Sequence, residues 1–285
     1  KKIKKFSAQL GVRAEFTEVK TELVTTNEIN NRDYLNFFPS AHFSYQLKKD
    51  NSIQLGYSRR IRRPRHYWLL PFFSFVDSRS NSSGNPNINP EYSDSYELGH
   101  LKNWKKSSLL SSVYYRYTTD VMDWVTISDA SGITRRRPQN LGIKNSFGLE
   151  FSGSHEIVKW WNVRGSFNFF REMRDGSFQG RDFDVDTYAW STRLNSKWAI
   201  KKKVNLQLSG NYRAPQQTPQ GERLARYSID GGFSFDVLKG NGTVAFNVKD
   251  MLNSRRRQST SVGQNFVSES SHQWRSRFFR VSFTY

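Results

Sequence analysis

The chain has 285 residues, of which 24% are charged and 15% aromatic, and its formal net charge is +19. A mean hydropathy of -0.74, with no apolar run of about eighteen residues, excludes helical membrane spans. The 22 Phe, 13 Tyr and 8 Trp residues are too many for a disordered chain. Cysteine is absent, which excludes disulfides and thiolate chemistry. These properties suit a sheet with one apolar face and one wet face.

Apolar and polar residues alternate along most of the chain, which predicts about twelve strands. The predicted strands are centred on residues 6–16, 41–47, 53–58, 96–98, 109–117, 141–152, 163–169, 188–198, 204–212, 227–237, 244–248 and 279–285. The first residues, KKIKKF, carry charge but lack the apolar stretch and cleavage site of a signal peptide. We therefore expect a mature chain or, preferably, a fragment that starts inside a larger protein.

The connections between these strands alternate between long and short. The long ones are 18–33, 62–92, 120–139, 173–186, 214–224 and 252–272, and the short ones centre on 48–51, 103–106, 159–161, 201–203 and 239–242. One end of the sheet thus has tight turns and the other has long excursions, as in outer-membrane barrels. The alternation predicts an all-β fold, a transmembrane antiparallel β-barrel.

Aromatic residues gather near the strand ends, on both sides of the predicted membrane. Those near short turns are Trp104, Trp160, Trp161 and Trp198, and those near long loops are Tyr117, Tyr188, Tyr212 and Tyr227. Amphipathic rings of this kind concentrate at the two bilayer interfaces. The pattern predicts two aromatic belts.

A specific motif lies in residues 57–98: Y-S-R-R-I-R-R-P, then L-P-F, G-N-P-N-I-N-P-E-Y and S-Y-E-L. With N-L-G at 140–142, G-L-E at 148–150 and V-K-D-M-L-N at 248–253, it resembles the C-terminal barrel region of Bacteroidetes-type TonB-dependent outer-membrane receptors. The final strand, which ends on Tyr285, resembles the terminal strand of outer-membrane barrels. The resemblance implies that residues 1–285 form the C-terminal part of a single 22-stranded barrel domain, without the N-terminal plug and first strands.

The resemblance also implies a function, namely uptake of a ligand across the bacterial outer membrane. In the family, an energy-coupling inner-membrane complex remodels the plug and the outer loops capture the substrate, which could be a siderophore, glycan, peptide or vitamin. The expected partners are outer-membrane lipid and lipopolysaccharide, the coupling complex if a plug exists, and a surface lipoprotein or other envelope protein. Two alternatives stay open: a plug-less barrel that serves as a structural or secretion-machinery partner, and a free-standing twelve-stranded pore or enzyme.

Three arginine-rich runs fall on the long-loop side of the predicted barrel. There, guanidinium groups could hold lipopolysaccharide phosphates or an acidic ligand, or could merely form a solvated rim. The candidate binding residues are Arg60, Arg62, Arg63, Arg65, Trp68, Arg135, Arg136, Arg137, Arg255, Arg256 and Arg257. Lysines dominate the short turns instead and are expected to anchor the membrane interface. Because the charge is divided between both ends of the sheet, no nucleic-acid partner is expected.

Other candidate sites have weaker patterns. Asp182, Asp184 and Asp186 share one parity and could bind calcium, but they lack the glycine and spacing of a recognised calcium loop. The five histidines have no metal-ligand spacing, and neither a G-x-S-x-G motif nor a P-loop occurs. We therefore expect no enzyme, metal or cofactor. The aromatic run at 67–75 could cover a ligand or a partner protein, but the favoured expectation is that it packs the loop against the barrel mouth. Residues 85–90 are expected to shape the turn that returns the chain to the sheet.

Overall fold

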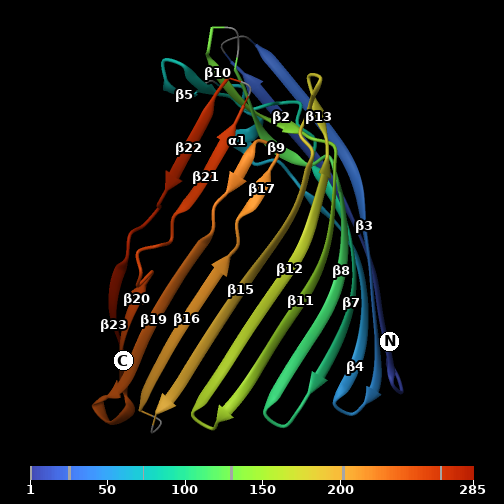
Figure 1. The fold of residues 1–285 in the computed structure, drawn as a ribbon. Coiled ribbons are helices and arrows are strands. Elements are labelled where there is room, and N and C mark those ends of the chain that lie inside the picture. The colour runs from blue at the N-terminus through green and yellow to red at the C-terminus, as the bar shows by residue number, and fades with distance from the viewer. Residues whose placement is uncertain (1, 25–26, 73, 129–130, 201–202, 264) are drawn as a thin grey trace.

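The computed structural model describes residues 2–24, 27–72, 74–128, 131–200, 203–263 and 265–285. These residues form an antiparallel sheet of thirteen strands in which each strand pairs with the next one along the wall (Figure 1). The strands are β1 (Lys2–Ile3), β2 (Phe6–Leu23), β3 (Glu28–Lys48), β4 (Asn51–Arg62), β7 (Glu91–Asn103), β8 (Ser107–Thr119), β11 (Ile143–Val158), β12 (Trp161–Asp175), β15 (Val185–Ile200), β16 (Val204–Arg213), β19 (Arg226–Val237), β20 (Gly242–Lys249) and β23 (Phe278–Thr284). Apart from the two-residue β1, these are the twelve predicted strands, so the predicted fold class is confirmed.

The long loops carry secondary structure of their own, at the upper end of Figure 1. They contain α1 (His66–Leu69), β5 (Ser74–Asp77), β6 (Ser80–Ser82), β9 (Met122–Ser128), β10 (Thr134–Asn140), β13 (Ser177–Phe178), β14 (Arg181–Asp182), β17 (Gln216–Thr218), β18 (Gly221–Arg223), β21 (Arg257–Val262) and β22 (Val267–His272). Three small sheets result: two four-stranded ones, in the orders β5-β6-β10-β9 and β17-β18-β21-β22, and the two-stranded pair of β13 and β14. At the other end, the turn after β19 contains the short 3-10 helix η1 (Leu238–Gly240). No helix in the described ranges is long and apolar enough to cross a membrane.

The predicted long loop at 18–33 is wrong. The ladder between β2 and β3 continues to the pair Leu23 and Glu28, so only residues 24–27 connect the two strands. The extension alternates charged and polar residues, including the ion pair between Lys20 and Glu22, with few apolar ones. Apolar alternation is required where a strand crosses lipid, but a ladder beyond the membrane needs only backbone pairing. The extension therefore gave no apolar signal.

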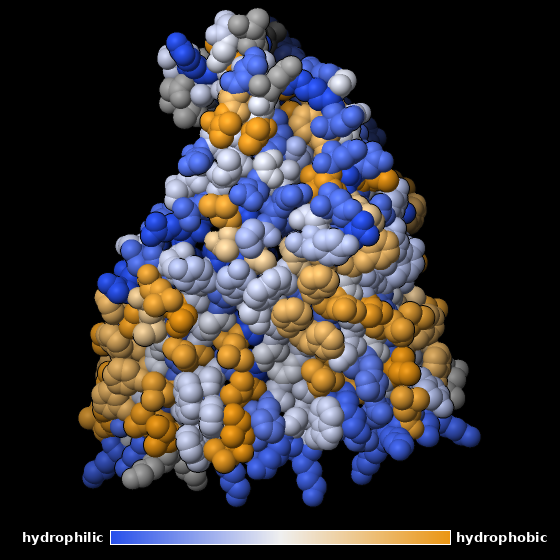
Figure 2. Space-filling view, in the orientation of Figure 1, coloured by the Kyte–Doolittle hydropathy of each residue, from blue (hydrophilic) through white to orange (hydrophobic). Residues whose placement is uncertain are grey.

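The two faces of the wall differ in chemistry. One face exposes large apolar side chains in most of its strands, such as Leu10 at 71%, Leu149 at 43% and Val281 at 69% of their surface. The opposite face carries mostly Ser, Asn, Gln and charged residues, and the long loops fold over this polar face. We call the polar face the inner face. Figure 2 shows apolar bands above a hydrophilic fringe at the short turns, as expected for a wall that meets lipid.

Aromatic side chains form two rows on the apolar face. Near the short turns, the rings of Trp161 and Trp198 stack with centroids 6.1 Å apart, and Trp160 stacks on Trp161 at 6.4 Å. Toward the long loops, a second row crosses four neighbouring strands through Tyr57, Tyr96, Tyr115 and Phe147. The first row contains Trp160, Trp161 and Trp198 of the predicted belt near the short turns. Of the predicted belt near the long loops, Tyr188 stacks on Phe169 at 6.1 Å and Tyr212 lies against Trp190 at 4.6 Å.

Candidate functional site

The long loops after β4 and β8 fold together into one assembly at the end of the sheet that bears the long loops. We call this end the mouth. β6 pairs in parallel with β10, which joins the two loops through their backbones. The Asn85 amide donates to the Pro138 carbonyl at 3.0 Å, and its oxygen accepts the Asn87 amide at 3.0 Å. Asn85 thereby shapes its own turn, as predicted, and also docks that turn on the neighbouring loop.

Two small apolar cores fill the space beneath this assembly. Leu69, Ile88 and Met122 form the first, against which Val19 and Trp68 pack. The second comprises Val125, Leu141 and Phe183, with Ile127 and Phe178 packed against it. Because a transmembrane wall has no core of its own, these clusters contain much of the buried apolar surface among the described residues. They make the mouth a folded structure.

Ion pairs tie the assembly to the barrel strands. Glu91, which is 5% exposed, accepts a hydrogen bond from the Met122 amide at 2.8 Å and pairs with Arg62. Arg174 lies between two carboxylates, Asp123 and Glu172, each 2.8 Å away. Removal of one partner of a buried ion pair leaves the other charge without a counter-ion, which is costly. Both sets of ion pairs therefore hold the loops in position.

A further link joins the loop between β16 and β19 to β9. The Gln220 side chain accepts the Thr126 amide at 2.8 Å and donates to the Thr126 carbonyl at 2.8 Å. One side chain thus satisfies both backbone groups of one residue. The mouth is therefore a connected structure built from four successive loops.

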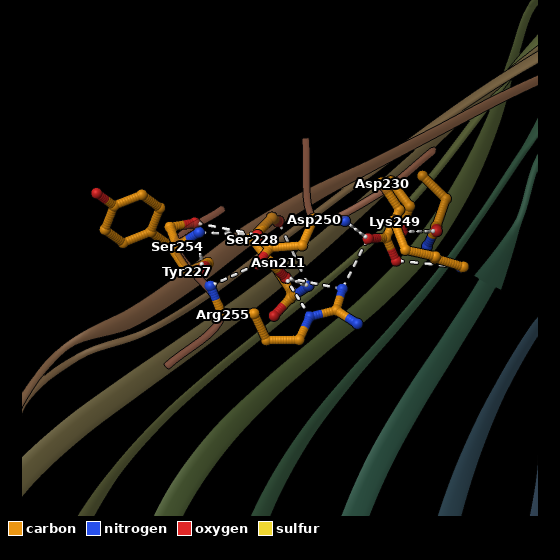
Figure 3. Close-up of polar contacts among 10 residues, drawn as sticks. Asn211, Tyr227, Ser228, Asp230, Lys249, Asp250, Ser254 and Arg255 are labelled. Atoms are coloured by element: carbon orange, nitrogen blue, oxygen red, sulfur yellow. Dashed lines mark hydrogen bonds and ion pairs between the residues drawn. The ribbon is translucent and has the colours of Figure 1, made fainter. Parts of the chain in front are cut away.

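The last long loop is fastened to the inner face by the network in Figure 3. Asp250, only 2% exposed, accepts the amides of Ser254 at 3.0 Å and Arg255 at 2.9 Å. The Arg255 guanidinium then reaches Asp230 at 2.7 Å and Ser228 at 3.1 Å. The V-K-D-M-L-N segment noted in the sequence therefore starts the loop in a defined direction.

Two concavities lie on the inner face, below the mouth. The larger, of about 730 Å³, is lined by residues that include His42, Arg60, Arg62, Glu97 and Arg116. The smaller, of about 420 Å³, is lined mainly by serines, with Arg164, Arg193 and Asn195. Both are polar surfaces with several guanidinium groups. They suit contact with a polar or anionic occupant of the lumen.

The first predicted arginine run is divided between the inner face and the mouth. Arg60 is exposed on the inner face and lines the larger concavity. Arg62 is committed to Glu91, and Arg63 donates to Glu15 at 2.7 Å and Thr17 at 2.9 Å. Arg65 donates to the Tyr67 hydroxyl at 3.1 Å.

The aromatic run at 67–75 divides in a similar way. Trp68 packs edge-on against Trp124 with centroids 5.6 Å apart, and Leu69 is buried beside it. Tyr67 and Phe72 instead remain 46% and 55% exposed. Phe73 lies outside the described residues. The predicted packing is thus confirmed for Trp68 and Leu69, while Tyr67 and Phe72 are accessible from outside.

The second and third arginine runs converge. Arg136 lies over the Trp124 ring at 5.0 Å, and Arg137 donates to the Gly84 carbonyl at 3.1 Å, while Arg135 belongs to the same strand, β10. Arg256 donates to the Asn253 carbonyl at 3.4 Å, and Arg257 opens β21. Arg136 and Arg257 are close enough for their charges to repel. The fold thus brings together two runs that are about 120 residues apart in the chain.

The aspartates considered for calcium are used separately. Asp186 pairs with Arg171 at 2.6 Å, and Asp184 accepts the Gly176 amide at 3.0 Å. In the part of the chain that the structure describes, no group of three or more metal-ligating side chains occurs. The calcium reading therefore gains no support from the geometry.

Sequence reasoning missed Arg213, Arg223 and Arg226 at the mouth. Arg213 and Arg226 flank the predicted loop at 214–224, so a hairpin necessarily places them opposite one another. Their placement on either side of the predicted loop was the sequence signal that could have identified them. Arg223 gave none, because its position depends on the pairing of β18 with β21.

The comparison with known proteins identifies the family of this chain. A model described as the outer membrane protein beta-barrel family matches residues 1–285. The chain belongs to the outer membrane protein beta-barrel family. As a member, it is a bacterial outer-membrane barrel, and the match assigns it to no enzyme family. The predicted location is thus confirmed.

Individual relatives of this barrel are distant. The iron-regulated outer membrane virulence protein of Vibrio cholerae serotype O1 is 22% identical over 198 residues, which cover 65% of this chain and 30% of the relative. Among solved structures, the copper transporter OprC aligns with 98% of this chain and 45% of its own, at 15% identity and a TM-score of 0.67. The siderophore receptor PirA of Pseudomonas aeruginosa aligns with 96% and 48%, at 14% identity and a TM-score of 0.60.

The coverage is unequal in every one of these comparisons. This barrel chain spans less than a third of the curated relative and less than half of the solved structures. At these identities the structural likeness establishes the fold. The sheet has the fold of part of the barrels of this copper transporter and this siderophore receptor.

Proposed function

We propose that this chain is the C-terminal part of a TonB-dependent barrel that takes up a ligand across the outer membrane. The observation that carries the proposal is the wall itself, which has a lipid-facing apolar side and an inner polar side with two concavities under a folded mouth. A barrel that only anchored other proteins would have no need of a polar, arginine-bearing inner wall. Matches to a copper transporter and a siderophore receptor support transport.

The remainder of the barrel belongs to the same proposal. Within the described residues, β23 has no ladder with β1 or β2, so the sheet has two open edges. An unpaired edge cannot face lipid, because its amides and carbonyls would lack partners. We therefore propose that further strands complete a 22-stranded barrel around an N-terminal plug. The motif resemblance supports an origin in Bacteroidetes-type bacteria.

Capture of the ligand is assigned to the mouth. Arg60, Arg65 and Arg256 present guanidinium groups on exposed residues, and Tyr67 adds an exposed ring. Arg62, Arg63, Arg137 and Arg255 make strong contacts within the protein, and we propose that they support the site by holding the loops. Trp68, Arg135, Arg136 and Arg257 complete the candidate set.

The proposed partners follow from the two faces. Lipid and lipopolysaccharide meet the apolar side, where a hollow of about 560 Å³ is lined by Leu55, Leu98, Phe147, Phe169 and others and bordered by Arg171. An energy-coupling inner-membrane complex would act through the plug. A surface lipoprotein or other envelope protein could contact the mouth from outside.

Deletion of the gene for the full natural chain tests the proposal. Uptake of radiolabelled ferric siderophores and of copper would be measured in the deletion strain, with and without a protonophore. We expect loss of at least one uptake activity, restored by the full gene and abolished by the protonophore. If every uptake rate is unchanged while the protein is present in the wild-type outer membrane, the structural or secretion-partner alternative is favoured.

A further inference from the structure

Two arginines face each other across the ladder between β16 and β19. Arg213 and Arg226 are direct partners in the register, and both lie on the inner face beside Asn211 and Ser228. Like charges placed directly opposite one another on a sheet destabilise it. Both residues are exposed, and within the described chain neither side chain makes a hydrogen bond or ion pair. The protein keeps an unfavourable arrangement with no internal compensation.

A second pair lies next to the first. In the small sheet at the mouth, Arg223 is the register partner of Ser259, so Arg223 and Arg257 are diagonal neighbours on one face. The charged neighbours of Arg226 are Arg213, Arg255 and Arg257, all of the same sign. Burial lowers the pKa of Arg223; the charge of Asp123 opposes this shift, and the charges of Arg257 and Arg174 add to it. A guanidinium nevertheless stays protonated, so the positive charge persists.

The nearby carboxylates are occupied elsewhere. Asp123 and Glu172 both bind Arg174, and Asp230 binds Lys249 and Arg255. Glu222 points to the face of β18 opposite Arg223, because successive side chains alternate. Four guanidinium groups from β16, β18, β19 and β21 therefore converge without an acidic counterpart of their own.

We propose that Arg213, Arg223, Arg226 and Arg257 form a binding site for a soluble, multiply charged oxyanion. Planar guanidinium groups bind phosphate-like or carboxylate-like oxygens through paired hydrogen bonds, and several such groups suit a ligand with more than one charge. The site lies on the inner face at the mouth, so a lipid headgroup in the outer leaflet does not reach it. A role of this site in uptake rests on the proposed function. Binding of the oxyanion at equilibrium does not depend on that function.

Titration calorimetry on the full natural chain in detergent micelles tests the site, with inorganic pyrophosphate as the probe. We expect saturable binding that weakens as salt rises. The double variant R213Q/R226Q should bind at least about tenfold more weakly, since two charge-assisted contacts are lost. The variant R280Q, which removes an exposed inner-face arginine from β23 that lines neither concavity, is the matched control and should bind as the wild type does.

Thermal unfolding separates loss of the site from loss of the fold. Without pyrophosphate, R213Q/R226Q should unfold at the wild-type temperature or above, because the repulsion is gone. Pyrophosphate should raise the unfolding temperature of the wild type and of R280Q, but not that of R213Q/R226Q. Should R213Q/R226Q fail to fold, R223Q/R257Q takes its place. The inference is overturned if the wild type shows no saturable binding, or if the folded double variant binds as tightly as the wild type. Neither result depends on transport.

Discussion

At the scale of single residues, a few side chains at the mouth hold backbone groups that would otherwise lack partners. Asp250 and Gln220 bond amides and carbonyls of neighbouring segments, and Asn140 donates to the carbonyls of Asn89 and Asp120 at 3.0 and 2.8 Å. Buried backbone groups without such partners are costly. These polar residues therefore have a structural role inside a site that also carries exposed arginines.

The Asp250 carboxylate provides the first prediction. In Asp250→Ala, the amides of Ser254 and Arg255 lose their acceptor, at a cost of about 1–3 kcal/mol. We expect trypsin to cleave at residues 255–257 faster than in the wild type, because the loop opens more often. Asp182→Ala removes a carboxylate from an exposed residue of β14 and should leave the cleavage rate unchanged. Equal rates for Asp250→Ala and the wild type would contradict the assigned role.

Gly142 provides the second prediction. Its φ is +59°, and an added Cβ would overlap the Asp175 carbonyl oxygen. Gly142→Ala should therefore lower the free energy of unfolding by about 1–3 kcal/mol, seen as a lower thermal midpoint by circular dichroism. Gly132→Ala is the control, since φ there is +79° but nothing lies within 4 Å of the new atom. The control should lose less free energy of unfolding than Gly142→Ala. Equal losses would show that the protein relieves the overlap between the added Cβ and the Asp175 carbonyl oxygen.

At the scale of elements, the loops behave as added β-structure. β6 joins β10, and β18 joins β21, so each four-stranded small sheet unites segments from two different loops. Backbone pairing of this kind gives long loops a defined shape without a large core. The positions of Arg136, Arg223 and Arg257 are consequences of this pairing.

The contact between Gln220 and Thr126 yields the third prediction. Gln220→Ala removes both hydrogen bonds that join the β16–β19 loop to β9. We expect the Thr126 amide to exchange with deuterium about tenfold faster, since one lost hydrogen bond corresponds to about 1 kcal/mol or slightly more. Gln217→Ala is the matched control, because that side chain makes no such bridge among the described residues. Unchanged exchange at Thr126 in Gln220→Ala would refute the link.

At the scale of the whole molecule, the wall separates lipid from water. The outward row of Leu55, Leu98, Val113, Leu149 and Phe169 has no protein neighbours beyond its own face. The inner face, in contrast, is polar and covered at one end by the loops. Such a molecule is stable only where lipid contacts one side, which agrees with its family.

Substitution on the two faces of one strand gives the fourth prediction. Leu149→Arg places a charge in the middle of β11 on the lipid side and should destabilise the folded protein by about 2–4 kcal/mol in bilayers. Ser152→Arg, on the same strand but on the inner face, should cost much less. Folding into lipid vesicles, measured against urea, distinguishes them. Equal effects would argue against the assignment of faces.

The sequence by itself determined the twelve membrane strands, their faces and the end that bears the long loops. It could do so because lipid forces apolar alternation and aromatic belts on every strand, which is a local signal. Because the prediction depends on apolar alternation, it assigned residues 18–33 to a loop. The ladder there lies beyond the lipid and carries no such pattern.

Only the tertiary structure decided which arginines lie close together. Arg136, Arg223 and Arg257 come from three different loops, and strand pairing between loops brings them together. It also decided that Arg62, Arg63 and Arg255 bind carboxylates, because those partners lie between 25 and 48 residues away in the chain. Contacts between distant segments depend on register and loop shape, and alternation along one strand does not encode either.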